Sequence, residues 1–214
     1  TSAGPEVAVA ATKTFTAQIA TIALLAARLM EGGERATALN AALRSLPNKV
    51  QQTLERSDEL KAAGAELARF TNMFVIGKGH MLPVTLEAAL KFKEIPYLHA
   101  EGVPAGELKH GPFALLDENT PVLALVSDDE HKGRMLTALR EIKVRKAPVF
   151  VLTDAPRREV EDVAAWAVSL PKAEAGLASV VFTVASQLLA YHTARVRGCP
   201  IDRPRNLAKS VTVP

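Results

Sequence analysis

Three charged residues, Glu87, Lys91 and Glu94, stand within a helical pattern that is otherwise nearly apolar. At about 100° per residue they share one stripe about 60° wide. Apolar residues flank the stripe, with Val84, Ala88 and Ile95 on one side and Leu86 and Leu90 on the other. A solvated face with an i,i+4 Glu–Lys pair, worth about 0.3–0.5 kcal/mol, is the simpler interpretation. A stripe this narrow also suits a cleft, in which burial and a neighbouring charge tune a carboxylate for proton transfer.

A polar stretch after this helix carries four more ionisable side chains, His99, Glu101, Glu107 and His110. We expect this stretch to be a loop. A metal site would need these groups to converge, and the sequence has no HExxH or CxxC pattern. We therefore predict neither a metal nor another cofactor. His110 could act chemically, because a histidine can move a proton near neutral pH. The alternative is that His110 is merely packed in the structure.

A glycine-rich turn, Gly77-Lys78-Gly79, lies between a strand pattern and the charged helix. Backbone N–H groups in such a turn suit an anion such as a phosphate. The glycines are equally compatible with a tight strand-to-helix connection that binds nothing.

The elements that would hold these groups alternate between strand and helix. Apolar runs predict strands at 73–76, 121–127 and 147–153, and an edge strand at 164–170. Helical patterns lie at 81–95, 131–145 and 175–196. Such alternation predicts an α/β fold in which helices cover both faces of a parallel sheet in three layers. The runs at 121–127 and 147–153 are continuously apolar, as expected of strands buried on both faces.

The chain before this alternating region has helical patterns. Residues 6–31 predict one long helix, buried on several sides, with Pro5 suited to its first turn. Residues 35–45 predict a short helix that ends before Pro47. Residues 48–70 are amphipathic and are typical of a connector between two globular parts.

The composition excludes several functional classes. With 48% hydrophobic and 23% charged residues, it is that of a soluble globular protein. The net charge of +3 is weak and scattered, so we expect no nucleic-acid partner. No run reaches the roughly 20 apolar residues of a membrane span, and the start shows no signal peptide. The single cysteine, Cys199, fits a reducing compartment, so we predict a cytoplasmic location and no membrane partner.

Three runs resemble a known family. They are AGPEVAVAATKTFTAQ (3–18), LEAALKFKEIPYLHAEGVPAGELKHGPFALLD (86–117) and LLAYHTARVRGCPIDRPRNLAKSVTVP (188–214). They look like glucosamine-6-phosphate synthase, the glutamine:fructose-6-phosphate amidotransferase. The similarity is to its C-terminal isomerase half, which is built from two sugar-isomerase (SIS) domains. The motifs AGELKHGP and PRNLAKSVTV are specific to this enzyme and its nearest relatives, and SIS domains in general would not show them.

The resemblance implies a SIS-type three-layer sheet preceded by helices from an incomplete first SIS domain. Residues 1–33 would be the C-terminal helix of that first domain, and residues 34–71 a helical connector. Residues 72–198 would be the second SIS domain. Residues 199–214, which have no periodicity, would be a tail that returns to the active site.

The resemblance also implies residue roles. Glu94 would be the base that moves a proton between C1 and C2 of the sugar, with Lys91 beside it in contact with the substrate. His110 would assist ring opening and would come from the neighbouring subunit of a dimer. Lys209 would form a Schiff base with the fructose carbonyl, because an amine is nucleophilic and its iminium is an electron sink.

The sugar would also contact the backbone of Val9 and of Ala208. At Ala11 the family has a serine that contacts the sugar, so this chain would lack one hydroxyl contact. The serine- and threonine-rich loop that holds the phosphate in the family, and its glutaminase domain, are not among these 214 residues.

The predicted function is conversion of fructose 6-phosphate, with ammonia derived from glutamine, to glucosamine 6-phosphate. The expected partners are a sugar phosphate, a second copy of the chain in a homodimer, and a glutaminase domain or free ammonia. Two alternatives stay open. One is a non-catalytic sugar-phosphate-binding or dimerisation module, and the other is a phosphosugar isomerase or deaminase with another substrate.

Overall fold

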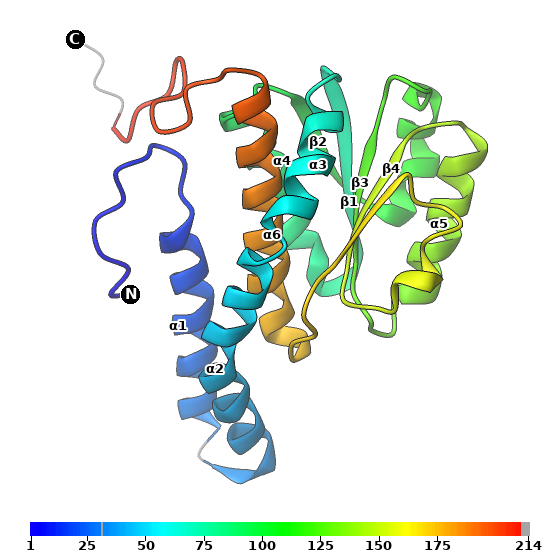
Figure 1. Ribbon diagram of the computed structural model, residues 1–214. Helices are drawn as coiled ribbons and strands as arrows, with labels where there is room; N and C mark the ends of the chain where they lie inside the picture. The colour runs from blue at the N-terminus through cyan, green and yellow to red at the C-terminus, as the bar shows by residue number, and fades with distance from the viewer. Residues whose placement is uncertain (31, 211–214) are drawn as a thin grey trace.

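The protein is a five-stranded parallel sheet with helices on both faces (Figure 1). The computed structural model describes residues 1–30 and 32–210. The strand order is β2-β1-β3-β4-β5. The strands are β1 (Asn72–Gly77), β2 (His99–Pro104), β3 (Val122–Val126), β4 (Val149–Thr153) and β5 (Trp166–Ser169). The predicted three-layer α/β fold is confirmed.

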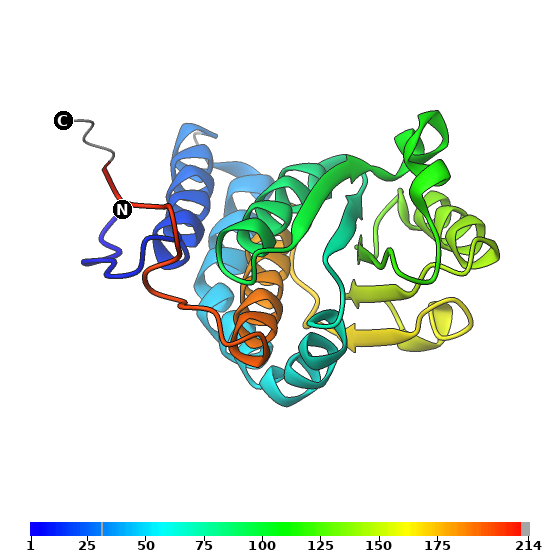
Figure 2. The ribbon, with the colours of Figure 1, turned by 90° about the horizontal axis from the view of Figure 1, so that it is seen from above.

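Alternate strand residues build two cores, one on each face of the sheet. Met73 and Val75 of β1 face the helices α3 (Ser57–Leu67), α4 (Leu82–Glu94) and α6 (Ala175–Val196). Phe74 and Ile76 face α5 (Lys132–Val144) on the other side. Seen from above, α4 and α6 lie on one side of the sheet and α5 lies on the other (Figure 2). Every residue of β3 and β4 is buried, which explains their uninterrupted apolar sequences.

The long helix α6 is the centre of the first core. In the described part of the chain it is the helix whose length and apolar composition would suffice to cross a membrane. However, 67% of that apolar window is buried inside the protein. It packs against α3, α4 and the hairpin formed by the first two helices. We therefore interpret α6 as a core helix.

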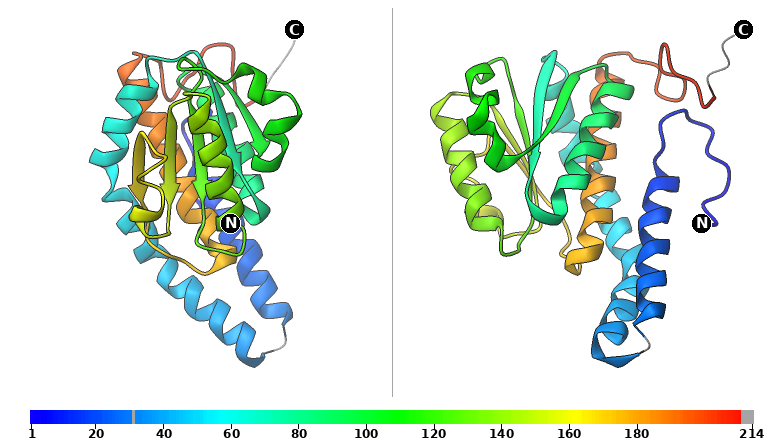
Figure 3. Two further views of the ribbon diagram at one scale, coloured as in Figure 1. Left: turned by 90° about the vertical axis from the view of Figure 1, so that its right-hand side faces the viewer. Right: turned by 180° about the vertical axis from the view of Figure 1, so that it is seen from behind.

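The first two helices, α1 (Lys13–Leu29) and α2 (Gly33–Leu54), form a hairpin that extends beyond the sheet (Figure 3). The predicted helix over 6–31 is wrong at its start, because α1 begins only at Lys13. The expectation that this helix is buried on several sides is also wrong within this chain, since Ala27 is the buried residue of α1. Ile22, Leu25 and Leu29 are exposed. Residue 31 lies outside the described residues.

Two further expectations are corrected by the structure. The predicted break at Pro47 is wrong, since α2 continues through it. The neighbouring Leu46 is buried against Leu177 and Val180 of α6, and this packing holds the helix together where one backbone hydrogen bond is missing. The polar stretch predicted as a loop begins instead with β2, which pairs with β1 and is an edge strand of the sheet that the described residues form. An edge strand needs no apolar alternation on its outer side, so the pattern did not reveal it.

Gly77 at the end of β1 is required for close packing of α4. A Cβ at this position would lie 2.3 Å from Oγ1 of Thr85 and 3.1 Å from the backbone oxygen of Met81. We expect Gly77→Ala to lower the free energy of unfolding by about 1–3 kcal/mol, measured by urea denaturation. Gly133→Ala is the matched control, because nothing lies within 4 Å of its Cβ position. That change should raise stability by up to about 1 kcal/mol, and equal effects of the two would contradict the packing argument.

Candidate active site

The charged stripe of α4 is a compact cluster around a buried lysine. The side chain of Lys91 is 2% exposed. Its Nζ lies 2.5 Å from Oε2 of Glu94 and 3.3 Å from Oε1 of Glu87. The two carboxylates are 19% and 11% exposed, respectively. The interpretation as a solvated face is therefore wrong for this stripe, and the groups stand where burial strengthens their interactions.

The two flanks of the stripe differ. Val84, Ala88 and Ile95 are buried in the core, whereas Leu86 and Leu90 are exposed. The stripe is therefore the border between the packed side of α4 and its open side. A ligand that approaches over the two leucines would meet the carboxylates at their accessible edge.

One lysine faces two carboxylates, so the cluster carries a formal charge of −1 when all three groups are ionised. Burial raises the pKa of Glu87, and the opposing attraction of Lys91 limits the rise. Oε1 of Glu87 has no hydrogen-bond partner among the described residues. The arrangement is suited to holding and passing a proton between carboxylates on one helix.

The C-terminal tail is attached directly beyond the end of α4. The backbone N–H of Arg205 donates to Oη of Tyr97 at 2.7 Å. The guanidinium of Arg205 lies 4.4 Å from the centre of the Tyr97 ring, in cation–π geometry. Tyr97 follows the last residue of α4 by only three positions. The predicted ordered tail is present up to residue 210, and residues 211–214 lie outside the described part.

We expect Tyr97→Phe to loosen the tail. The change removes the acceptor of the Arg205 amide and keeps the aromatic ring. Loss of one hydrogen bond, worth about 0.5–1.5 kcal/mol, should speed exchange of that amide up to about tenfold in hydrogen–deuterium exchange. Tyr191→Phe is the matched control, since its hydroxyl accepts a hydrogen bond from the exposed side chain of Arg195 on α6. An unchanged Arg205 exchange rate in Tyr97→Phe would count against this attachment.

The N-terminal segment lies beside the tail, as Figures 1 and 2 show. The N–H of Val9 donates to the carbonyl of Asp202 at 3.0 Å. Nζ of Lys209 lies 3.7 Å from Oε2 of Glu6. The structure thus brings Val9 and Lys209 onto adjoining segments. Ala11 is half-buried on the first segment, and Ala208 is exposed on the second.

His110 occupies a different place. It is exposed at the end of the short helix η2 (Ala105–His110), whose Ala105 and Leu108 pack into the core on the α5 side. Glu94 belongs to α4, on the opposite face of the sheet. Within one chain the structure therefore does not bring His110 and Glu94 together.

The other ionisable residues of this region lie apart. His99 and Glu101 belong to β2 and line a cavity of about 270 Å³ with Leu115 and Thr120. Lys78, from the glycine turn, lines another of about 240 Å³ with Lys109 and Arg134. In residues 1–30 and 32–210 no three His, Cys, Asp or Glu side chains converge as metal ligands would.

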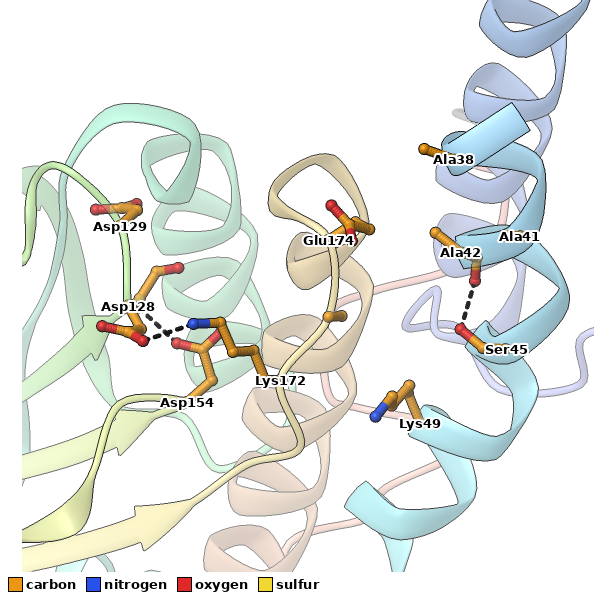
Figure 4. Close-up of a pocket in the computed structure, with 12 residues that line it drawn as sticks. Ala38, Ala41, Ala42, Ser45, Lys49, Asp128, Asp129, Asp154, Lys172 and Glu174 are labelled. Atoms are coloured by element: carbon orange, nitrogen blue, oxygen red, sulfur yellow. Dashed lines mark hydrogen bonds and ion pairs between the residues drawn. The ribbon is translucent and has the colours of Figure 1, made fainter. Parts of the chain in front are cut away.

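A larger cavity, of about 760 Å³, lies between α2 and the carboxyl ends of β3 and β4 (Figure 4). Asp128 follows β3, Asp154 follows β4, and Nζ of Lys172 is 2.7 Å from Oδ2 of Asp128. Burial raises the pKa of Asp154. Sequence reasoning missed this group, although carboxyl ends of neighbouring parallel strands meet at one edge. It shares no lining residue with the α4 cluster.

Comparison with known proteins identifies the family. A family model described as SIS domain matches residues 66–197. The chain belongs to the SIS-domain family. The matched SIS region contains all five strands and the helix that carries Lys91 and Glu94.

The similarity extends beyond the SIS domain to both ends of the chain. Glutamine–fructose-6-phosphate aminotransferase (isomerizing) from Halobacterium salinarum is 48% identical over 99% of this chain, which covers 35% of that protein. The enzyme of the same name from Chlorobaculum tepidum is 43% identical over 100% of the chain, again covering 35% of the relative. The SIS chain therefore spans about a third of the length of the curated relatives it matches.

A solved structure shows the same relationship. The C-terminal domain of glucosamine-fructose-6-phosphate aminotransferase from Francisella tularensis has a TM-score of 0.88 to this chain at 34% identity. The match covers 95% of this chain and 59% of that domain. The predicted resemblance to the C-terminal part of this enzyme is confirmed, as is the SIS-type fold.

Proposed function

We propose that this chain is the isomerase part of a glucosamine-6-phosphate synthase, acting in the cytoplasm on fructose 6-phosphate. The observation that carries the proposal is the buried contact between Lys91 and Glu94 on α4, with the lysine-bearing tail held just beyond the end of that helix. A base, a cation and a separate amine are the groups that a ketose-to-aldose shift with amination requires.

Glu94 is the proton carrier in this proposal. It removes a proton from C1 of the open-chain sugar and returns it to C2, so the carbonyl moves from C2 to C1. Lys91, 2.5 Å away, keeps the carboxylate oriented and places a positive charge beside the oxygens that become negative. When ammonia has replaced the C2 oxygen as an imine, the same proton shift gives the 2-amino sugar.

Lys209 forms the Schiff base at C2, and Val9 and Ala208 contact the sugar through their backbones. Ala11 offers no hydroxyl, so we expect one sugar contact fewer than in relatives with serine there. His110 opens the sugar ring in the site of a second copy of the chain. Its exposure, and its place on the opposite face from Glu94, support this dimeric arrangement.

The division into parts follows from the same proposal. We propose that residues 1–33 are the C-terminal helix of a first SIS domain and that residues 34–71 are a helical connector. The second SIS domain is then formed by residues 72–198, and the active-site tail by residues 199–214. The exposed Ile22, Leu25 and Leu29 of α1 support an apolar partner for that helix. A glutaminase domain or free ammonium supplies the nitrogen.

The test is an assay of the purified chain with fructose 6-phosphate, with and without ammonium. We expect glucose 6-phosphate without ammonium, and glucosamine 6-phosphate with it. Formation of both products that survives Glu94→Gln and Lys209→Ala would refute the assigned roles. Calorimetric binding of fructose 6-phosphate without turnover would favour the non-catalytic module, and neither binding nor turnover would overturn the proposal.

A further inference from the structure

The carboxylate of Glu6 is held in a network of its own. Its side chain is 7% exposed. Oε1 accepts hydrogen bonds from the N–H of Thr12 at 2.8 Å and from its hydroxyl at 3.2 Å. Oε2 accepts from the hydroxyl of Thr14 at 2.5 Å and faces Nζ of Lys209 at 3.7 Å. The network connects the start of α1 to the reactive end of the tail.

Glu6 stays ionised throughout the neutral range. Desolvation is the largest single influence and raises its pKa, but the hydrogen bonds from Thr14 and Thr12 together outweigh it and lower the pKa to about 2. Those bonds also fix the position of the carboxylate, since both oxygens are held by groups at the start of α1. The protein thus keeps a fixed negative charge beside the lysine.

We propose that Glu6 is a positioning residue that holds Lys209 in place and acts as the counter-ion of the iminium formed on it. This inference rests on the proposed function, in which Lys209 reacts with the sugar carbonyl. No role for Glu6 follows from the sequence resemblance.

The chemistry explains why a fixed anion is useful here. The neutral amine of Lys209 adds to the C2 carbonyl, one proton is taken up, and water leaves with the former carbonyl oxygen. The product is a carbon–nitrogen double bond whose nitrogen carries one hydrogen and a positive charge. A carboxylate at 3.7 Å stabilises that cation, and it does not have to move to do so.

The other charged groups on the two segments do not replace Glu6. The N-terminal segment leads into Lys13, which is a cation, and the tail carries Arg203 and Arg205, which are cations as well. The tail carries one carboxylate side chain among its described residues, Asp202, and it has no ion pair with Lys209. Gln187 of α6, which donates to the carbonyl of Thr12, is uncharged. Glu6 is thus the described carboxylate within 4 Å of the lysine.

The test is reductive trapping of the Schiff base. The chain is incubated with fructose 6-phosphate and sodium borohydride, and the modified fraction at Lys209 is measured by peptide mass spectrometry. At substrate concentrations below saturation we expect Glu6→Gln to lower this fraction about tenfold, the loss expected for a charge-assisted contact of about 1.4 kcal/mol. Glu6→Asp, which restores the charge, should recover most of it. A purely structural role would not distinguish glutamine from aspartate in this way.

Two controls separate charge from folding. Glu34→Gln removes an exposed carboxylate on α2 and should leave trapping unchanged. Raising the sodium chloride concentration from 0.05 M to 0.5 M should reduce trapping in the wild type and have little effect in Glu6→Gln, because salt screens a partly exposed ion pair. Melting temperatures of all variants are recorded alongside.

The outcomes distinguish this inference from the proposed function. If the wild type is not trapped at Lys209, or if the Lys209→Ala chain carries as much trapped sugar on its other lysines as the wild type carries in total, both fall. If the wild type is trapped at Lys209 and Glu6→Gln is trapped equally well, the counter-ion role alone is overturned.

Discussion

Replacement of Glu94 by glutamine is expected to lower kcat for glucose 6-phosphate formation by about 10²- to 10⁴-fold, the range for loss of a general base. Glutamine keeps the size of the side chain and still accepts a hydrogen bond from Lys91. It cannot take up the C1 proton. KM should change little, since the proposal gives Glu94 a task in proton transfer and none in binding. A coupled assay of glucose 6-phosphate measures both constants.

The control for this change is Lys93→Gln, one residue earlier on the exposed side of α4. It should leave kcat within about a factor of two, as surface substitutions usually do. Urea denaturation of both variants checks that the fold is kept. A Glu94→Gln protein that retains more than about a tenth of wild-type kcat would show that another group is the base.

Replacement of Lys91 by methionine is expected to cost about 3–5 kcal/mol of stability. Methionine fills a similar volume, so the loss comes from the charge. Glu87 and Glu94 would then face each other across a largely buried space with no cation between them. Urea denaturation at neutral pH measures the cost, and Lys93→Met should cost less than about 0.5 kcal/mol.

The pH dependence of this deficit has a definite sign. Burial raises the pKa of Glu87 above its ordinary value of 4.5, so the native state binds this proton more tightly than the unfolded chain does. The resulting stabilisation is complete below about pH 4.5 and is lost as the pH rises through the native pKa of Glu87. Without Lys91 the pKa of Glu87 rises further, because the opposing attraction is gone. Lys91→Met should therefore lose less stability at pH 5 than at pH 8. Adding Glu87→Gln should recover part of the loss at pH 8, and a deficit independent of pH would contradict the electrostatic explanation.

The sheet could be predicted largely from the sequence, and the reason is local. The runs that became β3 and β4 are apolar throughout because both faces of those strands are covered. β2 escaped detection because it lies at an edge, where polar residues such as His99 and Glu101 are tolerated. The N-terminal segment was mistaken for helix because its apolar residues, such as Val7, Ala10 and Ala11, continue the apolar pattern of α1. The segment instead pairs with the tail at Asp202, and no local pattern reveals that contact.

The candidate site, like the sheet, could be predicted only as far as local sequence patterns determine it. Spacing alone placed Glu87, Lys91 and Glu94 on one stripe, because an α-helix fixes the angles. Spacing could not say that Lys91 is enclosed, since burial depends on how α4 is packed, and α4 packs on elements as distant in sequence as α6. Glu6 and Tyr97 gave no signal at all. Each of them contacts the tail, which lies far away in the sequence, so that contact exists only in the folded chain.

The hydrogen bond from Val9 to Asp202 joins two segments from opposite ends of the chain, neither of which belongs to the sheet. Segments of this kind open and close locally, at a small fraction of the free energy that unfolds a core. The tail can fray and carry Lys209 away while β1 to β5 and α6 remain intact. Thermal stability and the fraction of competent molecules are then governed by two separate equilibria. A preparation of this protein can melt like a fully native one and still contain many molecules in which the amine of Lys209 is out of place.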